Sequence, residues 1–79
     1  MPTVKEISGP YRFFFYSFDC NEPPHIHVQR DRQLCKFWLE PLALARVYGF
    51  TPRELNQIGG LIHSHLPLIL EAWYEHCDR

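Results

Sequence analysis

The spacing of apolar residues changes once along this chain, close to Glu40-Pro41. Before that point apolar and polar residues alternate in short runs, and after it the apolar residues recur every three or four positions. These are the periods of strands and of amphipathic helices. A chain of 79 residues has room for one small core. We therefore expect one domain over residues 1–79 with an α+β fold, a small antiparallel sheet followed by helices on one face.

Four segments of the first half have the composition of strands, so a sheet of about four strands is expected. They span residues 3–7, 11–18, 25–30 and 33–39. The second segment, YRFFFYSF, is apolar on both faces, which favours a central strand covered on one face and partly covered on the other. Alternation assigns its residues to two faces: Tyr11, Phe13 and Phe15 against Arg12, Phe14, Tyr16 and Phe18.

A two-residue turn at Asp31-Arg32 would join the last two strands and pair Arg30 with Gln33. The same register sets four more pairs opposite each other: Val28 and Cys35, Ile26 and Phe37, His27 and Lys36, His25 and Trp38. Directly opposed residues share a face, so the hairpin has one apolar face and one polar, aromatic face.

Two helices are expected after the strands. Pro41 suits a first helical position and Gly49 a C-terminal stop, which predicts a short helix over residues 41–48. The run from Thr51 to Glu54 has the pattern of a capping box with proline at the first helical position. A long helix should follow, with an apolar stripe formed by Leu55, Ile58, Ile62, Leu66, Ile69, Trp73 and Cys77. Gly59-Gly60 weakens this helix, and Pro67 predicts a kink or break near Ser64-His65.

Charge and cysteine content bound the function classes. The net charge of −1 lacks the basic excess that is usual for duplex DNA binders. No apolar run reaches the roughly 18 residues of a membrane span, and no secretory signal is seen, so no membrane partner is expected. Cys20, Cys35 and Cys77 are an odd number without C-x-x-C spacing. This pattern favours free thiols, no structural disulfide and a cytoplasmic location.

The pair His25 and His27 is the first candidate site. Residues two apart on a strand point the same way, so the two imidazoles share a face behind Pro23-Pro24. Such a pair could be an acid and a base in phosphodiester cleavage, or it could decorate the sheet beside Trp38 and Lys36. It could also bind a metal, together with a further ligand from the preceding loop: Asp19, Cys20 or Glu22.

Arginine and aromatic side chains form a second candidate site. Arg30, Arg32 and Lys36 could gather at the hairpin, where guanidinium groups suit RNA or an acidic protein segment. Tyr16 and Trp38 lie on the second aromatic face, and an exposed face of this kind is typical of an interface. No Gly-rich phosphate loop, Ser-His-Asp arrangement or C-x-x-C pair is present, so no cofactor is expected.

Several strings in this sequence resemble the small bacterial domain-of-unknown-function family 4160. They are Met1-Pro2-Thr3-Val4, FFFYS at 13–17, NEPPHIHV at 21–28, KFWL at 36–39, Gly49-Phe50, Arg53-Glu54-Leu55 and LEAW at 70–73. The resemblance covers essentially the whole chain, and its family motif falls on Glu22, Pro23, Pro24, His25 and His27. Gly59-Gly60 and Pro67 depart from the helix-favouring family pattern.

The resemblance implies a protein partner, because members of this family look like parts of two-gene modules grouped with type II toxin–antitoxin systems. We therefore expect an interaction module that binds a small protein encoded by the neighbouring gene. A first alternative is a metal-independent ribonuclease, with His25 and His27 as acid and base and RNA as the partner. A second alternative is a metal-binding domain built on the same two histidines.

Overall fold

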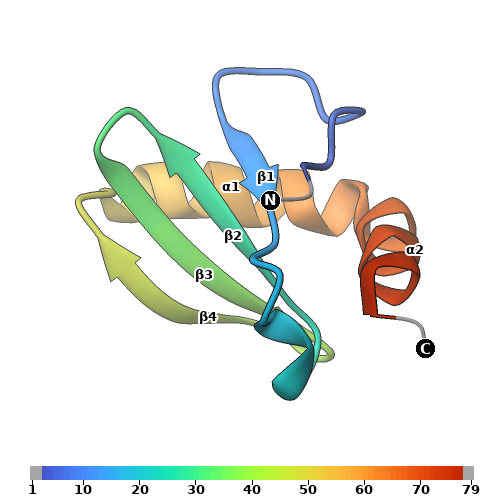
Figure 1. Cartoon of the computed structure of the whole chain (residues 1–79). Coiled ribbons are helices and arrows are strands. Elements are labelled where there is room, and N and C mark those ends of the chain that lie inside the picture. The colour runs from blue at the N-terminus through green and yellow to red at the C-terminus, as the bar shows by residue number, and fades with distance from the viewer. Residues whose placement is uncertain (1–2, 78–79) are drawn as a thin grey trace.

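The computed structural model describes residues 3–77; Met1-Pro2, the start of the family-like string, and residues 78–79 lie outside the described part. Four antiparallel strands form one sheet in the order β1-β2-β3-β4, and two helices follow (Figure 1). The elements are β1 Arg12–Phe14, β2 His25–Arg30, β3 Gln33–Leu39, β4 Leu42–Tyr48, α1 Pro52–Ser64 and α2 Leu66–Cys77. The predicted α+β fold with four antiparallel strands is confirmed.

The β2–β3 hairpin has the predicted register. Arg30 pairs with Gln33 across the turn, and His25 pairs with Trp38 at the other end. Asp31 has a φ of 55°, the left-handed conformation that a two-residue hairpin turn requires. The predicted division into an apolar face and a polar, aromatic face is therefore present.

The segment 42–48 is a strand, so the predicted short helix is wrong. Leu42 pairs with Leu39 and Tyr48 pairs with Leu34, with one irregularity between Lys36 and Phe37. Helix propensity differs by only a few tenths of a kcal/mol per residue among ordinary residues. Pairing with residues 34–39 of β3 outweighs that preference, and Gly49, with a φ of 90°, ends a strand instead of a helix.

Two strand predictions near the N-terminus need correction. Residues 3–7 make an isolated bridge between Thr3 and Phe14 and no strand of their own. The predicted strand over 11–18 shrinks to β1, which lies at an edge of the sheet, not at its centre. The chain leaves the ladder because the backbone N–H of Tyr16 donates to the carboxylate of Asp19, 2.8 Å away.

From Thr51 onward the two helices follow the prediction closely. Thr51 accepts a hydrogen bond from the N–H of Glu54, and the Glu54 side chain accepts one from Thr51, a complete capping box. The helix breaks at His65, whose ring lies 2.8 Å from the carbonyl of Leu61. Pro67 explains the break because it has no N–H to continue the α1 ladder. No helix in residues 3–77 has the length and apolar character needed to cross a membrane.

The core lies between the sheet and the helices, and α1 runs across the back of the sheet in Figure 1. Ile58 and Ile62 of α1 and Ile69 of α2 are fully buried in this core. Its aromatic members include Phe13, Phe15, Phe37 and Trp73. His25 and His27 lie on the face of β2 opposite to Ile26 and Val28, where Asp19 of the 3₁₀ turn (Asp19–Asn21) contacts both rings and Trp73 of α2 contacts His25.

Cys20 and Cys77 form a disulfide, so the predicted absence of a structural disulfide is wrong. The two residues are 57 positions apart in the sequence, and their spacing carries no local signal of pairing. The end of α2 returns to the 3₁₀ turn η1 (Asp19–Asn21) and brings the sulfur atoms together. Cys35 is a free, buried cysteine. The cytoplasmic location thus loses the support of the cysteines and stays a prediction.

Candidate functional site

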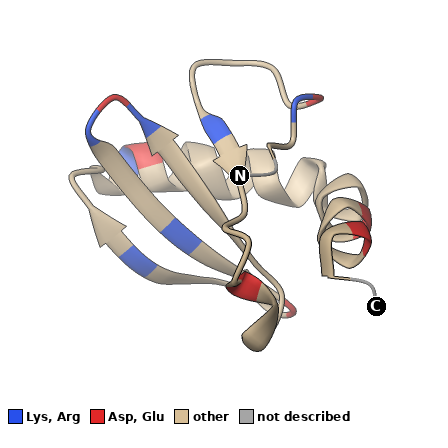
Figure 2. Ribbon diagram, in the orientation of Figure 1, with Lys and Arg blue, Asp and Glu red and all other residues tan. Residues whose placement is uncertain are grey.

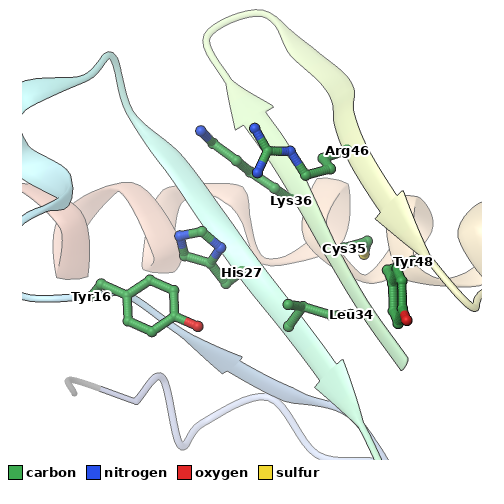
Figure 3. Close-up of a pocket in the computed structure, with 7 residues that line it drawn as sticks. All are labelled: Tyr16, His27, Leu34, Cys35, Lys36, Arg46 and Tyr48. Atoms are coloured by element: carbon green, nitrogen blue, oxygen red, sulfur yellow. The ribbon is translucent and has the colours of Figure 1, made fainter. Parts of the chain in front are cut away.

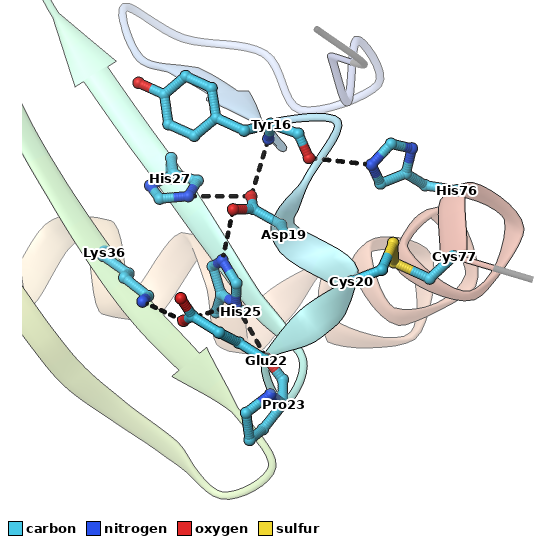
Figure 4. Close-up of polar contacts among 10 residues, drawn as sticks. All are labelled: Tyr16, Asp19, Cys20, Glu22, Pro23, His25, His27, Lys36, His76 and Cys77. Carbon is cyan, nitrogen blue, oxygen red and sulfur yellow. Dashed lines mark hydrogen bonds and ion pairs between the residues drawn. A yellow bond between two sulfur atoms is a disulfide. The ribbon is translucent and has the colours of Figure 1, made fainter.

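Asp19 joins the two histidines that the sequence singles out. Its Oδ1 lies 3.2 Å from His25 Nε2, and its Oδ2 lies 3.0 Å from His27 Nε2 (Figure 4). Asp19 and His25 are buried, with exposed fractions of 4% and 0%. A buried carboxylate is costly unless it is paired, and here it contacts two imidazoles. The loop before β2 therefore supplies an acidic third member of the histidine pair.

His25 uses one ring nitrogen for the backbone. Its Nδ1 lies 2.9 Å from the carbonyl oxygen of Pro23, which can only accept, so Nδ1 carries a proton. The Nε2 atom faces Asp19 without a hydrogen bond, despite the short distance. Among the buried side-chain nitrogen and oxygen atoms of residues 3–77, it is the one with no hydrogen-bond partner. Such atoms are rare in native proteins and ask for an explanation.

His27 lies closer to solvent, with 12% of its side chain exposed. Its ring stacks on Phe14 at a centroid distance of 5.5 Å and meets the edge of Tyr16 at 4.7 Å. Burial lowers the pKa of His27 below its usual value, and the Asp19 carboxylate opposes that shift only in part. The ring is thus held in one place by aromatic packing and by one carboxylate.

The far end of the chain fixes the loop that carries Asp19. The Cys20–Cys77 disulfide ties the residue next to Asp19 to α2. His76 Nε2 lies 3.0 Å from the carbonyl oxygen of Tyr16, on the other side of Asp19 in the sequence (Figure 4). Two links to α2 therefore flank the carboxylate and hold it against β2.

Glu22, a residue of the family motif, pairs with Lys36 at 2.5 Å. This hydrogen bond from Lys36 holds the pKa of Glu22 below its usual value. Lys36 also lies 4.4 Å from the ring centroid of Trp38, which in turn meets the ring of His25 edge-on. These contacts connect Glu22, Lys36 and Trp38 to the buried His25, whose ring meets that of His27 edge-on.

A pocket of about 210 Å³ opens on this face of the sheet (Figure 3). Strands β2, β3 and β4 all contribute to it, together with the segment after β1. Its lining comprises Tyr16, His27, Leu34, Cys35, Lys36, Arg46 and Tyr48. Burial raises the pKa of the Cys35 thiol to about 12, so this lining residue stays protonated at neutral pH.

The structure places the remaining predicted site residues elsewhere. Arg30 lies over the ring of Tyr11 at 5.8 Å, and Tyr11 belongs to the core on the other face. Arg32 is in the β2–β3 turn, at the opposite end of the hairpin from His25. The sequence reasoning missed Arg46 and Tyr48, because it assigned their segment to a helix. A period-two reading of 42–48 would have found both.

Charge is distributed unevenly between strands and the rest of the chain. The strands carry Arg12, Arg30, Lys36 and Arg46, and no aspartate or glutamate (Figure 2). The exposed large hydrophobic residues also concentrate on one strand. Of the five in the described chain, Leu44, Val47 and Tyr48 lie on β4, with exposed fractions of 44%, 42% and 73%.

A family model described as Domain of unknown function (DUF4160) matches residues 11–74. No curated protein and no solved structure matches the chain. The matched segment contains β1 to β4, α1 and most of α2, together with the Asp19–His25–His27 cluster. Because the match covers well over half of the sequence, the chain belongs to the DUF4160 family.

Proposed function

We propose that this protein is an interaction module that binds a protein partner along β4. The partner adds an extended strand to this edge, a known mode of peptide recognition in which main-chain hydrogen bonds supply affinity. The observation that carries the proposal is the exposure of β4. Six of its seven residues are exposed, and three of these are large and apolar.

An edge strand of this composition is unfavourable in isolation. In residues 3–77, β4 has β3 on one side and no strand on the other. Native proteins usually protect such edges with charges, prolines or a covering element, since bare apolar edges aggregate. Arg46 is the single charged residue within β4. Coverage by a partner strand would bury the apolar residues and satisfy the outer backbone groups.

The neighbouring pocket gives the partner strand a place to anchor. Tyr48 and Arg46 of β4 line it beside Lys36. A strand that lies along β4 can direct one side chain into this pocket. Since the sheet carries cations and no carboxylates, we expect acidic residues in the partner strand.

Members of the family look like parts of two-gene modules, which favours one source for the partner, a small protein encoded by the neighbouring gene. The ribonuclease alternative has less support. Its mechanism needs two imidazoles in contact with substrate, and His25 is fully buried. RNA as a partner also has less support, because Arg30 and Arg32 lie apart from the pocket.

Co-expression with the neighbouring gene product tests the proposal. We expect a stable complex by size exclusion with light scattering, and slower amide hydrogen exchange over residues 42–48 in the complex than in the free protein. Val47→Lys should weaken binding by about tenfold or more, because it places a charge in the buried contact. The matched control is Tyr74→Lys, an exposed apolar position on α2, which should bind like the native protein.

Three outcomes would count against the proposal. The first is that the two proteins remain separate after co-expression. The second is that Val47→Lys binds the partner as well as Tyr74→Lys does. The third is a free protein that dimerises through β4, which would make the occupant of the edge a second copy of this chain. Circular dichroism of both variants establishes that each is folded.

A further inference from the structure

We propose that Asp19, His25 and His27 bind one divalent transition-metal ion of the zinc class. The site lies where η1 meets the start of β2, and it is separate from β4. It goes beyond the interaction function, and it can fail while partner binding succeeds. Three features of the site favour an ion: the positions of the three donor atoms, the hydrogen bonding of His25 and the contacts that hold Asp19 in place.

The donor atoms already have the spacing of a coordination shell. Each residue offers one ligand atom, and these atoms all lie within 4.8 Å of one another. Asp19 oxygens stand 3.2 Å from His25 Nε2 and 3.0 Å from His27 Nε2. A tetrahedral centre with bonds of about 2.0–2.1 Å separates neighbouring ligand atoms by about 3.3 Å. An ion would therefore need only small movements of these side chains.

The hydrogen bonding of His25 indicates what the site lacks. With Nδ1 donating to Pro23, the tautomer that has one ring proton carries a lone pair at Nε2, 3.2 Å from Asp19 Oδ1 and in an orientation that makes no hydrogen bond to it. Two electron-rich atoms at this distance in a buried place repel each other. A cation between them removes the repulsion and satisfies the buried Nε2. Metal-bound histidines commonly donate their second ring nitrogen to a backbone carbonyl, as His25 does.

The Asp19 side chain is held in position by its neighbours, as metal ligands commonly are. Its Oδ2 accepts the Tyr16 N–H, and the disulfide and His76 hold the loop on both sides. Oδ1 lies 3.2 Å from His25 Nε2, where both atoms can bind the same ion. A ligand that is held in place before binding loses little conformational freedom when the metal arrives.

The donor set selects the class of ion. Two imidazole nitrogens and one carboxylate oxygen suit zinc and its transition-metal neighbours, whereas Mg²⁺ and Ca²⁺ prefer shells of oxygen ligands. The three protein ligands leave one position of a tetrahedron for water, as in many reactive zinc sites. His27 lines the pocket as well, so that water would lie near the pocket side of the cluster.

A second set of possible metal ligands lies at the end of α2, so a test must distinguish zinc binding there from binding at Asp19. Cys20, His76 and Cys77 also lie within ligand distance of one another. Their two sulfur atoms are joined in the disulfide, which removes the thiolates that bind zinc. The experiment therefore uses the oxidised protein, with one free thiol per chain verified under denaturing conditions.

Calorimetric titration of chelator-stripped, oxidised protein with Zn²⁺ tests the site. We expect one ion per chain, no binding of Mg²⁺, and a loss of affinity of about 100-fold or more for His27→Gln and Asp19→Asn, at least as large as that seen for outer-shell ligands. His63→Gln on the exposed face of α1 is the matched control and should bind as the native protein does. The absence of one-to-one binding would overturn the proposal.

A spectroscopic measurement on the native chain removes any dependence on how the variants fold. One equivalent of Zn²⁺ should shift the Nε2 resonances of His25 and His27 together in a ¹⁵N NMR spectrum. The resonances of His63, His65 and His76 should stay where they are. Shifts at His76 instead would assign the metal to the cysteine end of α2, and unchanged spectra would show that no site exists.

Discussion

His25 Nε2 lies 3.2 Å from Asp19 Oδ1 in a buried contact that contains no hydrogen bond. The other carboxylate oxygen is fully used, since it accepts from Tyr16 and contacts His27. The two oxygens of one side chain therefore have different surroundings. Oδ2 stabilises the backbone of the loop, and Oδ1 lies near a ring nitrogen that makes no hydrogen bond.

Removal of the Asp19 carboxylate should destabilise the protein even without metal. In Asp19→Ala the N–H of Tyr16 and the ring of His27 lose their acceptor, and a buried polar group left unsatisfied costs about 1–3 kcal/mol. Asp19→Asn keeps an oxygen for Tyr16 and should cost less. Urea denaturation in the presence of a chelator measures both. Equal stabilities for Asp19→Ala and the native chain would contradict this account of the loop.

Reduction of the Cys20–Cys77 disulfide should lower the free energy of unfolding by about 2–4 kcal/mol. The bond closes a long loop, because 57 positions separate the two residues, and it restricts the unfolded chain accordingly. Thermal unfolding with and without a reductant measures the effect.

Alkylation of the thiols gives the control. Cys35 of the native protein should resist labelling, since burial raises its pKa to about 12, and denatured oxidised protein should label at Cys35 alone. A reductant that leaves the melting temperature unchanged would argue against this bond.

The capping box should make the free energy of unfolding depend on pH in the acid range. The hydrogen bond from the Thr51 N–H holds the pKa of Glu54 below its usual value. A lowered folded-state pKa gives stability that is present above the unfolded pKa and lost as the pH falls through the folded one. Glu54→Gln should therefore flatten the stability profile below about pH 5. Urea midpoints across the acid range measure this, with exposed Glu71→Gln as the matched control. If both variants show the same pH dependence of stability as the native protein, the capping box is not the cause of that dependence.

Two glycine substitutions should change stability in opposite directions. Gly60→Ala adds a methyl group into open space on an exposed helix position and should stabilise the protein by about 0.5–1 kcal/mol. Gly49→Ala meets a φ of 90° and places its Cβ 3.3 Å from Gln33 Cγ, so it should destabilise by about 1 kcal/mol or more. Denaturation of the pair measures both effects. The same sign for both would show that backbone conformation at Gly49 is not limiting.

Local signals predicted those parts of the structure that depend on a few neighbouring residues. The turn at Asp31-Arg32 determines the hairpin register, and therefore which face His25 and His27 share. The capping box and Pro67 determine where the helices begin and break. Each of these effects acts within one turn of chain, so the residues themselves contain the information.

The sequence by itself thus determined the α+β class, the hairpin, the helix ends and the position of the histidine pair. The tertiary structure alone decided that 42–48 is a strand, that Cys20 pairs with Cys77, and that Asp19 is buried between two imidazoles. The physical reason is that these features depend on contacts between residues that are far apart in the sequence. Helix propensity at 42–48 is weaker than pairing with β3, and the partner of Cys20 is 57 positions away. Only the packing of α2 against the loop brings that distant cysteine close, and the same packing holds Asp19 in place.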